Sequence, residues 1–277
     1  MTIRLANIRA GYENFALQNI NLHIETGSFT CLIGPNGCGK STLLKTIGRI
    51  LKAQSGQIEV AGLDILASSS KEVARKIAFL PQNPAVPAAI TVEQLVGYGR
   101  APYQGLFGFA SQEDREKVAE AITQTGLEAL KDRRLSELSG GQRQRAFIAM
   151  ALAQDTPYIM LDEPTSFLDL KYQYETLELL AKLHAKGRTC IVVLHDIAQA
   201  ARYASDLVVM KEGQIFAKGK PEEVISPQML TAVYGIRACV YADPVSNSPV
   251  VSPLPQLAVD GTRSNTSAPK AGLLAAE

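Results

Sequence analysis

The chain has 277 residues, with 28 Lys and Arg against 27 Asp and Glu and a formal net charge of +1. This balance excludes the broad basic surface typical of nucleic-acid-binding proteins, and we expect no nucleic-acid partner. The length suits one large or two modest domains, and no apolar run approaches the roughly 20 residues that span a bilayer. The N-terminus lacks the basic start and apolar block of a signal peptide, so any membrane association is expected to need a partner.

The first predicted elements are strands. Residues 2–9 and 17–25 alternate between apolar and polar side chains, as half-buried strands do. Residues 29–33 form an apolar, β-prone run that predicts a strand, and residues 43–47 predict a helix. The interpretation of the whole chain depends on the motif that lies between these two elements.

Residues 34–42 read Gly-Pro-Asn-Gly-Cys-Gly-Lys-Ser-Thr and fit the phosphate-binding P-loop pattern G-x-x-x-x-G-K-[ST]. The glycines allow backbone N–H groups to point inward, and the helix N-terminus that follows favours an anion. An ordinary Gly-rich turn is the alternative, but it rarely ends in Gly-Lys-Ser between a strand and a helix. Lys40 would reach the β- and γ-phosphates of a nucleotide, and Ser41 would bind Mg²⁺. The predicted nucleotide contacts are Gly34, Asn36, Gly37, Cys38, Gly39, Lys40, Ser41 and Thr42.

The four cysteines show no paired metal-binding spacing, which favours reduced thiols without a metal. Cys38 lies inside the P-loop motif, directly before a helix N-terminus. We expect its thiol to be partly exposed there, where the thiolate form is favoured.

A strand at 56–60, a short helix at 71–76 and a buried strand at 77–80 follow, and Pro81 ends the last of these. Residues 83–154 then predict helices without strands, starting at Thr91, at Ser111 and at Ser139. This range is interpreted as an inserted helical subdomain.

An apolar strand at 158–161 ends in two carboxylates, Asp162 and Glu163. Asp162 would hold Mg²⁺, and Glu163 could polarise the water that attacks the γ-phosphate. An ordinary acidic turn is the alternative, but beside a P-loop the pattern favours a catalytic pair.

Residues 138–142 read Leu-Ser-Gly-Gly-Gln and open a helix with a serine cap, which makes a second anion site. One γ-phosphate does not need two such sites in one chain. Ser139, Gly140, Gly141 and Gln142 are therefore predicted to face the nucleotide of another subunit, with a plain capped helix start as the alternative.

The remaining chain alternates helices at 170–186 and 196–204 with strands at 189–194, 206–210 and 214–217, which favours an α/β fold with a mostly parallel sheet. Four prolines follow between 244 and 255. Residues 243–277 are therefore predicted to be an extended and flexible tail beyond a domain of residues 1–242.

These motifs, in this order, resemble those of the ATP-binding-cassette (ABC) ATPases, over about residues 1–255. The resemblance implies a P-loop NTPase core with a RecA-like sheet, an N-terminal antiparallel β subdomain and the inserted helical subdomain. It also implies ATP and Mg²⁺ as cofactors and a head-to-tail homodimer. By the same resemblance, Gln82 is the Q-loop glutamine that contacts the metal and takes part in catalysis, Asp169 is the D-loop aspartate, His195 is the switch histidine, and Tyr12 stacks on adenine.

A finer resemblance, to the importers of ferric siderophores, haem and cobalamin, rests on residues 98–103, 165–170 and 194–203. It implies the ATPase subunit of a bacterial importer, most simply for ferric siderophores, with haem or cobalamin as alternatives. The partners would be an integral-membrane permease and, indirectly, an exported binding protein, at the cytoplasmic face of the inner membrane. One departure is Tyr172, where this group often has His, and we expect no consequence because that helix face carries no chemistry.

Two other functions are alternatives for a chain with these motifs. A soluble cassette ATPase for repair or translation usually carries two cassettes, a long coiled-coil insertion or metal-binding cysteines, none of which the sequence shows. A non-catalytic nucleotide-binding regulator is expected to lack Glu163 or His195, and both are present.

Overall fold

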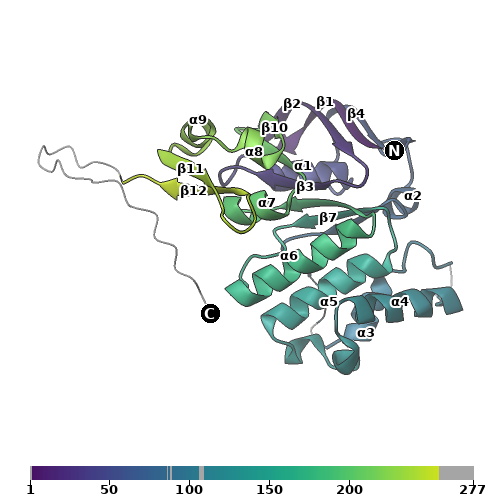
Figure 1. Cartoon of the computed structure of the whole chain (residues 1–277). Coiled ribbons are helices and arrows are strands. Elements are labelled where there is room, and N and C mark those ends of the chain that lie inside the picture. The colour runs from purple at the N-terminus through teal and green to yellow at the C-terminus, as the bar shows by residue number, and fades with distance from the viewer. Residues whose placement is uncertain (1, 86, 88, 106–108, 256–277) are drawn as a thin grey trace, which may run out of the picture.

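The centre of the computed structural model, which describes residues 2–85, 87, 89–105 and 109–255, is a six-stranded sheet with the order β10-β9-β3-β8-β7-β6 (Figure 1). The parallel strands are β3 (Phe29–Ile33), β6 (Ile77–Leu80), β7 (Tyr158–Asp162), β8 (Thr189–Val193) and β9 (Asp206–Lys211), and β10 (Gln214–Gly219) runs antiparallel to β9. Every residue of β3, β7 and β8 is buried, which explains their continuous apolar sequences. Since the strands are parallel, the segments that follow β3, β6, β7 and β8 meet at one edge of the sheet.

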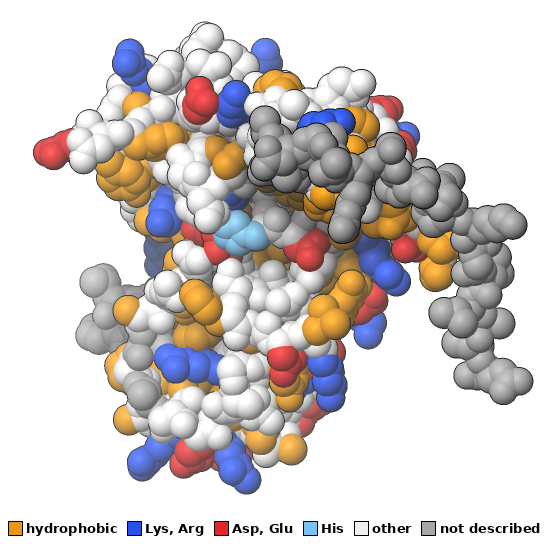
Figure 2. Space-filling view, turned by 90° about the vertical axis from the view of Figure 1, so that its left-hand side faces the viewer, with side chains coloured by type: hydrophobic (Ala, Val, Ile, Leu, Met, Phe, Trp, Pro, Cys, Tyr) orange, Lys and Arg blue, Asp and Glu red, His pale blue; other side chains and the backbone are white. Residues whose placement is uncertain are grey.

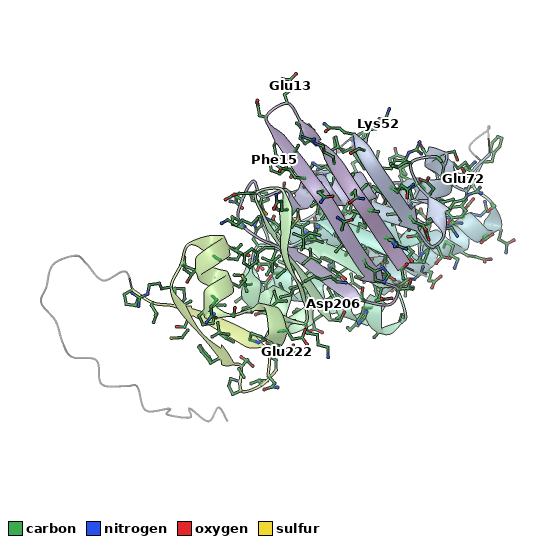
Figure 3. The ribbon with its side chains drawn as sticks, turned by 90° about the horizontal axis from the view of Figure 1, so that it is seen from above. Glu13, Phe15, Lys52, Glu72, Asp206 and Glu222 are labelled. Carbon is green, nitrogen blue, oxygen red and sulfur yellow. The ribbon has the colours of Figure 1, made fainter. Side chains whose placement is uncertain are left out.

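An antiparallel sheet with the order β2-β1-β4-β5 covers one face of this central sheet. Its strands are β1 (Thr2–Tyr12), β2 (Phe15–Glu25), β4 (Ser55–Val60) and β5 (Leu63–Asp64). α1 (Lys40–Ile47) contributes to the hydrophobic core that joins the two sheets. In the view from above, this sheet lies over the rest of the molecule, with Glu13 at the tip of its β1–β2 turn and Phe15 just below (Figure 3).

A second core lies on the other face of the central sheet, against α6 (Leu170–Ala185), α7 (Ile197–Tyr203) and the helices of the inserted segment. Neighbouring strand residues alternate between the two cores, so that Cys31 belongs to one and Leu32 to the other. The predicted α/β class, with a mostly parallel sheet and an N-terminal antiparallel sheet, is confirmed.

The helices between β5 and β7 are α2 (Ser70–Ala74), α3 (Val92–Tyr98), α4 (Gln112–Gln124) and α5 (Gly140–Ala153), with short 3₁₀ turns at Glu128–Leu130 and Leu135–Glu137. Among the described residues of 83–154, the only strand-like pairing is one bridge between Thr91 and Arg134. Thr91, Ser111 and Ser139 cap α3, α4 and α5 in capping boxes, as their sequences predict. α3, α4 and α5 pack on one another and form the lower part of Figure 1.

Arg100 joins these helices from the inside. It is only 2% exposed, and its Nε donates a 2.8 Å hydrogen bond to Asp114 Oδ1 at the start of α4. Its Nη1 donates to the carbonyl oxygen of Ala153 at the end of α5, 2.9 Å away, and its guanidinium lies 4.0 Å from the ring centre of Tyr103. Burial alone would raise the pKa of Asp114, but the hydrogen bonds from Arg100 and Ser111 outweigh it and lower that pKa.

We expect Arg100→Met to lower the free energy of unfolding by about 3–5 kcal/mol, because it leaves the Asp114 carboxylate buried without its cation. Urea denaturation followed by circular dichroism measures the change. The control is Lys171→Met, which removes an exposed ion pair to Glu175 (3.8 Å) and should cost less than about 1 kcal/mol. Equal stabilities for the two variants would contradict the role given to Arg100.

The C-terminal part differs from its prediction. After α8 (Pro221–Val224), α9 (Pro227–Met229) and a π-helical turn at Leu230–Tyr234, β11 (Ala238–Ala242) pairs antiparallel with β12 (Pro249–Pro253). The fold therefore continues past the predicted boundary at 242, and residues 243–255 are no loose tail. Asp243 accepts hydrogen bonds from the N–H groups of Val245 and Ser246 and forms the turn, and the two prolines stand at the ends of β12, which packs against α7. Residues 256–277 of the predicted tail lie outside the described residues.

Candidate active site

The P-loop leaves the end of β3 and passes directly into α1. Gly34 (φ +148°) lies so close to β9 that a Cβ atom would stand 2.3 Å from the carbonyl oxygen of Met210. Gly39 (φ +107°) ends the loop, and a Cβ there would meet Leu17 and Phe15 at 2.8 Å. No side chain among the described residues caps the first turn of α1, so its N–H groups can bind an anion.

Lys40 is folded back into its own loop. The side chain is 5% exposed, and its Nζ donates to the carbonyl oxygens of Gly34 (2.8 Å) and Pro35 (3.0 Å). These contacts hold the ammonium group beside the loop, where phosphate oxygens could replace the two carbonyls as acceptors.

Ser41 and Asp162 form the predicted metal pair. Ser41 Oγ donates a 2.7 Å hydrogen bond to Asp162 Oδ1, which joins the start of α1 to the end of β7. Burial raises the pKa of Asp162, and the Ser41 hydroxyl together with Lys45 acts in the opposite direction. A buried carboxylate beside a hydroxyl is an oxygen donor set that suits Mg²⁺, and a divalent cation would stabilise its charged form.

Glu163 is the centre of a cluster built from three strand ends. Its Oε1 lies 2.5 Å from His195 Nε2, after β8, and its Oε2 accepts hydrogen bonds from the side-chain amide of Gln82, after β6, and from Ser166 Oγ at 2.9 Å. Glu163 has φ +53°, a strained conformation for this residue type that is often found at functional sites. The structure thus brings Gln82, Glu163 and His195 together, and it adds Ser166, which sequence reasoning missed.

Glu163 and His195 line one cleft of about 330 Å³ together with residues of the P-loop and its surroundings: Tyr12, Phe15, Asn36, Gly37, Gly39, Lys40, Ser41 and Thr42. Tyr12 and Phe15 provide aromatic surface beside the loop, and Tyr12 is 55% exposed, as a ring that stacks on a base would be. Phe15 was also missed, although an aromatic residue just after the turn that follows Tyr12 was a usable signal. Figure 2 shows a histidine flanked by acidic side chains at the constriction between the upper part and the helical part.

The position of Cys38 differs from the expectation that its thiol is partly exposed. Its side chain is 4% exposed and is not among the residues that line the cleft. Burial raises the pKa of its thiol, and the attraction of Lys40 only partly opposes this effect. The thiolate is therefore disfavoured in spite of the nearby helix N-terminus, and only the backbone of Cys38 remains a candidate phosphate contact.

Five of the predicted site residues do not line the cleft of their own chain: Ser139, Gly140, Gly141, Gln142 and Asp169. Ser139 and Gly140 are exposed, and Asp169 caps α6 by accepting a 3.1 Å hydrogen bond from the N–H of Tyr172. A Cβ on Gly141 would lie 2.5 Å from the Tyr172 ring, so the start of α5 rests on that ring. Tyr172 was expected to have no consequence because its helix face carries no chemistry; in the structure its ring packs against the start of α5, where the predicted second anion site lies.

A phosphate loop between two sheets, with a strand-end glutamate facing it, defines a P-loop ATPase. The sequence model of the family described as "ABC transporter" matches residues 17–166, and the chain belongs to this family of ATP-binding proteins. It is 46% identical over 261 residues to the ferric enterobactin transport ATP-binding protein FepC of Escherichia coli (strain K12), covering 92% of this chain and 96% of the relative. It is 44% identical over 242 residues to the iron(3+)-hydroxamate import ATP-binding protein FhuC of Bacillus subtilis (strain 168), covering 87% and 90%.

Solved structures agree with this assignment. An inward-facing ABC transporter of the metal-chelate type matches with a TM-score of 0.80 and 28% identity, over 92% of this chain and 97% of that chain. The ATP-binding cassette MJ0796, as a dimer bound to ADP and Pi after hydrolysis, matches with a TM-score of 0.69 and 32% identity, over 79% and 98%. In the described part of the chain, no helix combines the length and the apolar character needed to cross a membrane.

Proposed function

We propose that this chain is the ATP-hydrolysing subunit of an importer that takes up ferric siderophores through a membrane permease. The observation that carries the proposal is the match over nearly the whole chain to ATP-binding proteins of ferric siderophore import. The contact of Glu163 with His195 supports hydrolysis rather than mere binding of nucleotide. Haem and cobalamin remain the alternative cargoes.

The site residues have separate roles in phosphoryl transfer. Lys40 and the N–H groups at the start of α1 bind the phosphates, and Tyr12 stacks on the base. Ser41 and Asp162, with Gln82, would hold Mg²⁺, which neutralises charge on the β- and γ-phosphates when it is bound. Glu163 accepts the proton of the attacking water, and His195 and Ser166 keep its carboxylate in place.

The second half of the site would come from a second copy of the chain. Ser139 and Asp169 lie outside their own cleft, and Phe167 beside them is 91% exposed with φ +63°, a strained and solvent-facing position for an aromatic residue. A head-to-tail homodimer places this surface against the phosphate loop of the partner. ATP would close the pair, and hydrolysis would let it open.

We expect Ser139→Arg to leave ATP affinity unchanged and to prevent ATP-dependent dimers, because the bulky cation blocks the helix start that faces the partner. Light scattering with Mg-ATP, in a Glu163→Gln background that preserves the nucleotide, measures the association. Ser69→Arg is the matched control, since Ser69 is also exposed and caps α2 in the same kind of capping box, but is not one of the residues predicted to face the partner. ATP-dependent dimers of the Ser139 variant would overturn the cross-subunit role.

The segment 82–109 would receive the cytoplasmic helices of the permease, at the inner face of the membrane, with an exported binding protein acting on the far side. Tyr98 and Phe109 are exposed in this segment, at 52% and 83%, and large exposed apolar side chains often mark interaction sites. Residues 86, 88 and 106–108 of this segment lie outside the described residues.

Uptake of radio-iron tests the cargo. The chain is reconstituted in proteoliposomes with a ferric siderophore permease, the matching binding protein and a ferric hydroxamate or ferric catecholate. ATP-dependent accumulation of iron that is absent with Glu163→Gln supports the proposal. Accumulation of haem or cobalamin in place of iron chelates would overturn the cargo, and ATP hydrolysis that no permease stimulates would overturn the transport role.

A further inference from the structure

The segment after β10 runs back to the phosphate loop. α8 and α9 lead into the π-helical turn Leu230–Tyr234, which Gly235 ends at φ +69°. Leu230 and Val233 are buried in the core on the α6 and α7 side. This packing fixes the turn, and Tyr234 lies at its end. π-helical turns are rare and occur frequently at functional sites.

The hydroxyl of Tyr234 is buried and has no hydrogen-bond partner among the described residues. After burial, the groups that act on its pKa are the thiol of Cys38 and the backbone N–H of Gly34, which puts the hydroxyl near the start of the phosphate loop. Burial and, to a smaller extent, Cys38 raise the pKa of the Tyr234 phenol far above its usual range, while the Gly34 N–H acts in the opposite direction. The phenol therefore stays protonated, and its oxygen lies near an N–H group without completing a hydrogen bond. A buried hydroxyl without a partner is unusual in a native protein and needs a physical reason.

The carbonyl group of Gly34, which belongs to the next peptide unit, is held by Lys40. Lys40 Nζ donates to the Gly34 carbonyl oxygen at 2.8 Å, and Gly34 itself lies against the backbone of Met210. Further along the loop, the Cys38 carbonyl oxygen accepts a 3.0 Å hydrogen bond from the N–H of Gly213. If Lys40 turns to phosphate oxygens, the Gly34 carbonyl loses this donor, and the backbone dihedrals at Gly34 can adjust. Gly34 is thus the point on which both Lys40 and Tyr234 act.

We propose that Tyr234 is a positioning residue of the phosphate loop, whose hydroxyl accepts a hydrogen bond from the Gly34 N–H when nucleotide is bound. This inference rests on the proposed nucleotide site. The hydroxyl lacks its partner in the empty loop and gains it in the loaded loop, so it favours the loaded form. The C-terminal segment is then energetically coupled to nucleotide binding, although it contributes no residue to the cleft.

The test is Tyr234→Phe, which removes only the hydroxyl. We expect the dissociation constant of Mg-ATP to rise about fivefold to tenfold, equivalent to ~1–1.4 kcal/mol, and the thermal midpoint without nucleotide to stay the same or rise. Tyr241→Phe is the control, because Tyr241 is a half-exposed tyrosine of the same segment, on β11. Hydrogen–deuterium exchange adds a direct readout: ATP should slow the exchange of the Gly34 amide in the wild-type chain and not in Tyr234→Phe.

A merely structural role would lower the thermal midpoint equally with and without ATP and leave the dissociation constant unchanged, and this result would overturn the inference. If the proposed nucleotide site itself is wrong, the binding measurements give a different result. In that case the wild-type chain would not bind Mg-ATP, or Lys40→Met would bind it equally well. Wild-type binding that depends on Lys40 but not on Tyr234 would overturn the Tyr234 inference alone.

Discussion

The Glu163→Gln variant is expected to bind ATP as tightly as the wild-type chain and to lose nearly all turnover. Glutamine has the shape of glutamate and can still accept the hydrogen bond from Ser166 Oγ, so the cleft keeps its form. It cannot take the proton of the attacking water. Loss of a positioned general base lowers turnover by about 10²- to 10⁴-fold. A phosphate-release assay measures turnover, and titration with a fluorescent ATP analogue measures affinity.

The matched control for this variant is Glu175→Gln on α6, the same chemical change at a half-exposed side chain that, in the described part of the chain, forms an ion pair with Lys171. It should hydrolyse ATP at the wild-type rate. Unchanged hydrolysis in Glu163→Gln would remove Glu163 as the base.

The second large effect is expected for Lys40→Met, which should weaken ATP binding by about 10- to 100-fold, in line with the loss of a hydrogen bond to a charged group. The loss has two sources in this structure. Methionine cannot neutralise the phosphates, and it leaves the carbonyl oxygens of Gly34 and Pro35 without the donor that holds the loop. Isothermal titration calorimetry with Mg-ATP measures the affinity.

Lys52→Met is the control for this variant, because Lys52 is an exposed lysine a few residues beyond α1 (Figure 3). Its affinity should equal that of the wild-type chain. Wild-type affinity in Lys40→Met would show that the nucleotide phosphates are bound elsewhere.

Much of the fold could be predicted because its strongest signals are local. Buried parallel strands require continuous apolar runs, and residues 29–33 and 158–161 therefore mark β3 and β7 closely. Capping residues also predict where helices start, and Thr91 and Ser139 are the N-cap residues of α3 and α5. The P-loop was predictable for a similar reason, since backbone geometry dictates its glycines.

The rest of the fold and of the site depends on contacts between distant segments, which no local sequence pattern reveals. β12 was hidden because its two prolines argue against a strand, yet both stand at its ends. Cys38 was expected to be partly exposed from its place before a helix, but its side chain belongs to the core beside α1 and is buried. Ser166 lies in the turn after β7 and contacts Glu163, and Tyr172 lies on α6 and contacts Gly141. Neither contact can be predicted from the local sequence.

The four methionines of the described residues are divided between the two cores on either side of the central sheet. Met160 and Met210 lie in the core beside α1, and Met150 and Met229 belong to the core on the opposite face. Methyl resonances of methionine, labelled with ¹³C, would therefore report on each core separately in one NMR spectrum. Adding nucleotide to such a sample shows directly whether a change at the phosphate loop stays on one side of the sheet or crosses it.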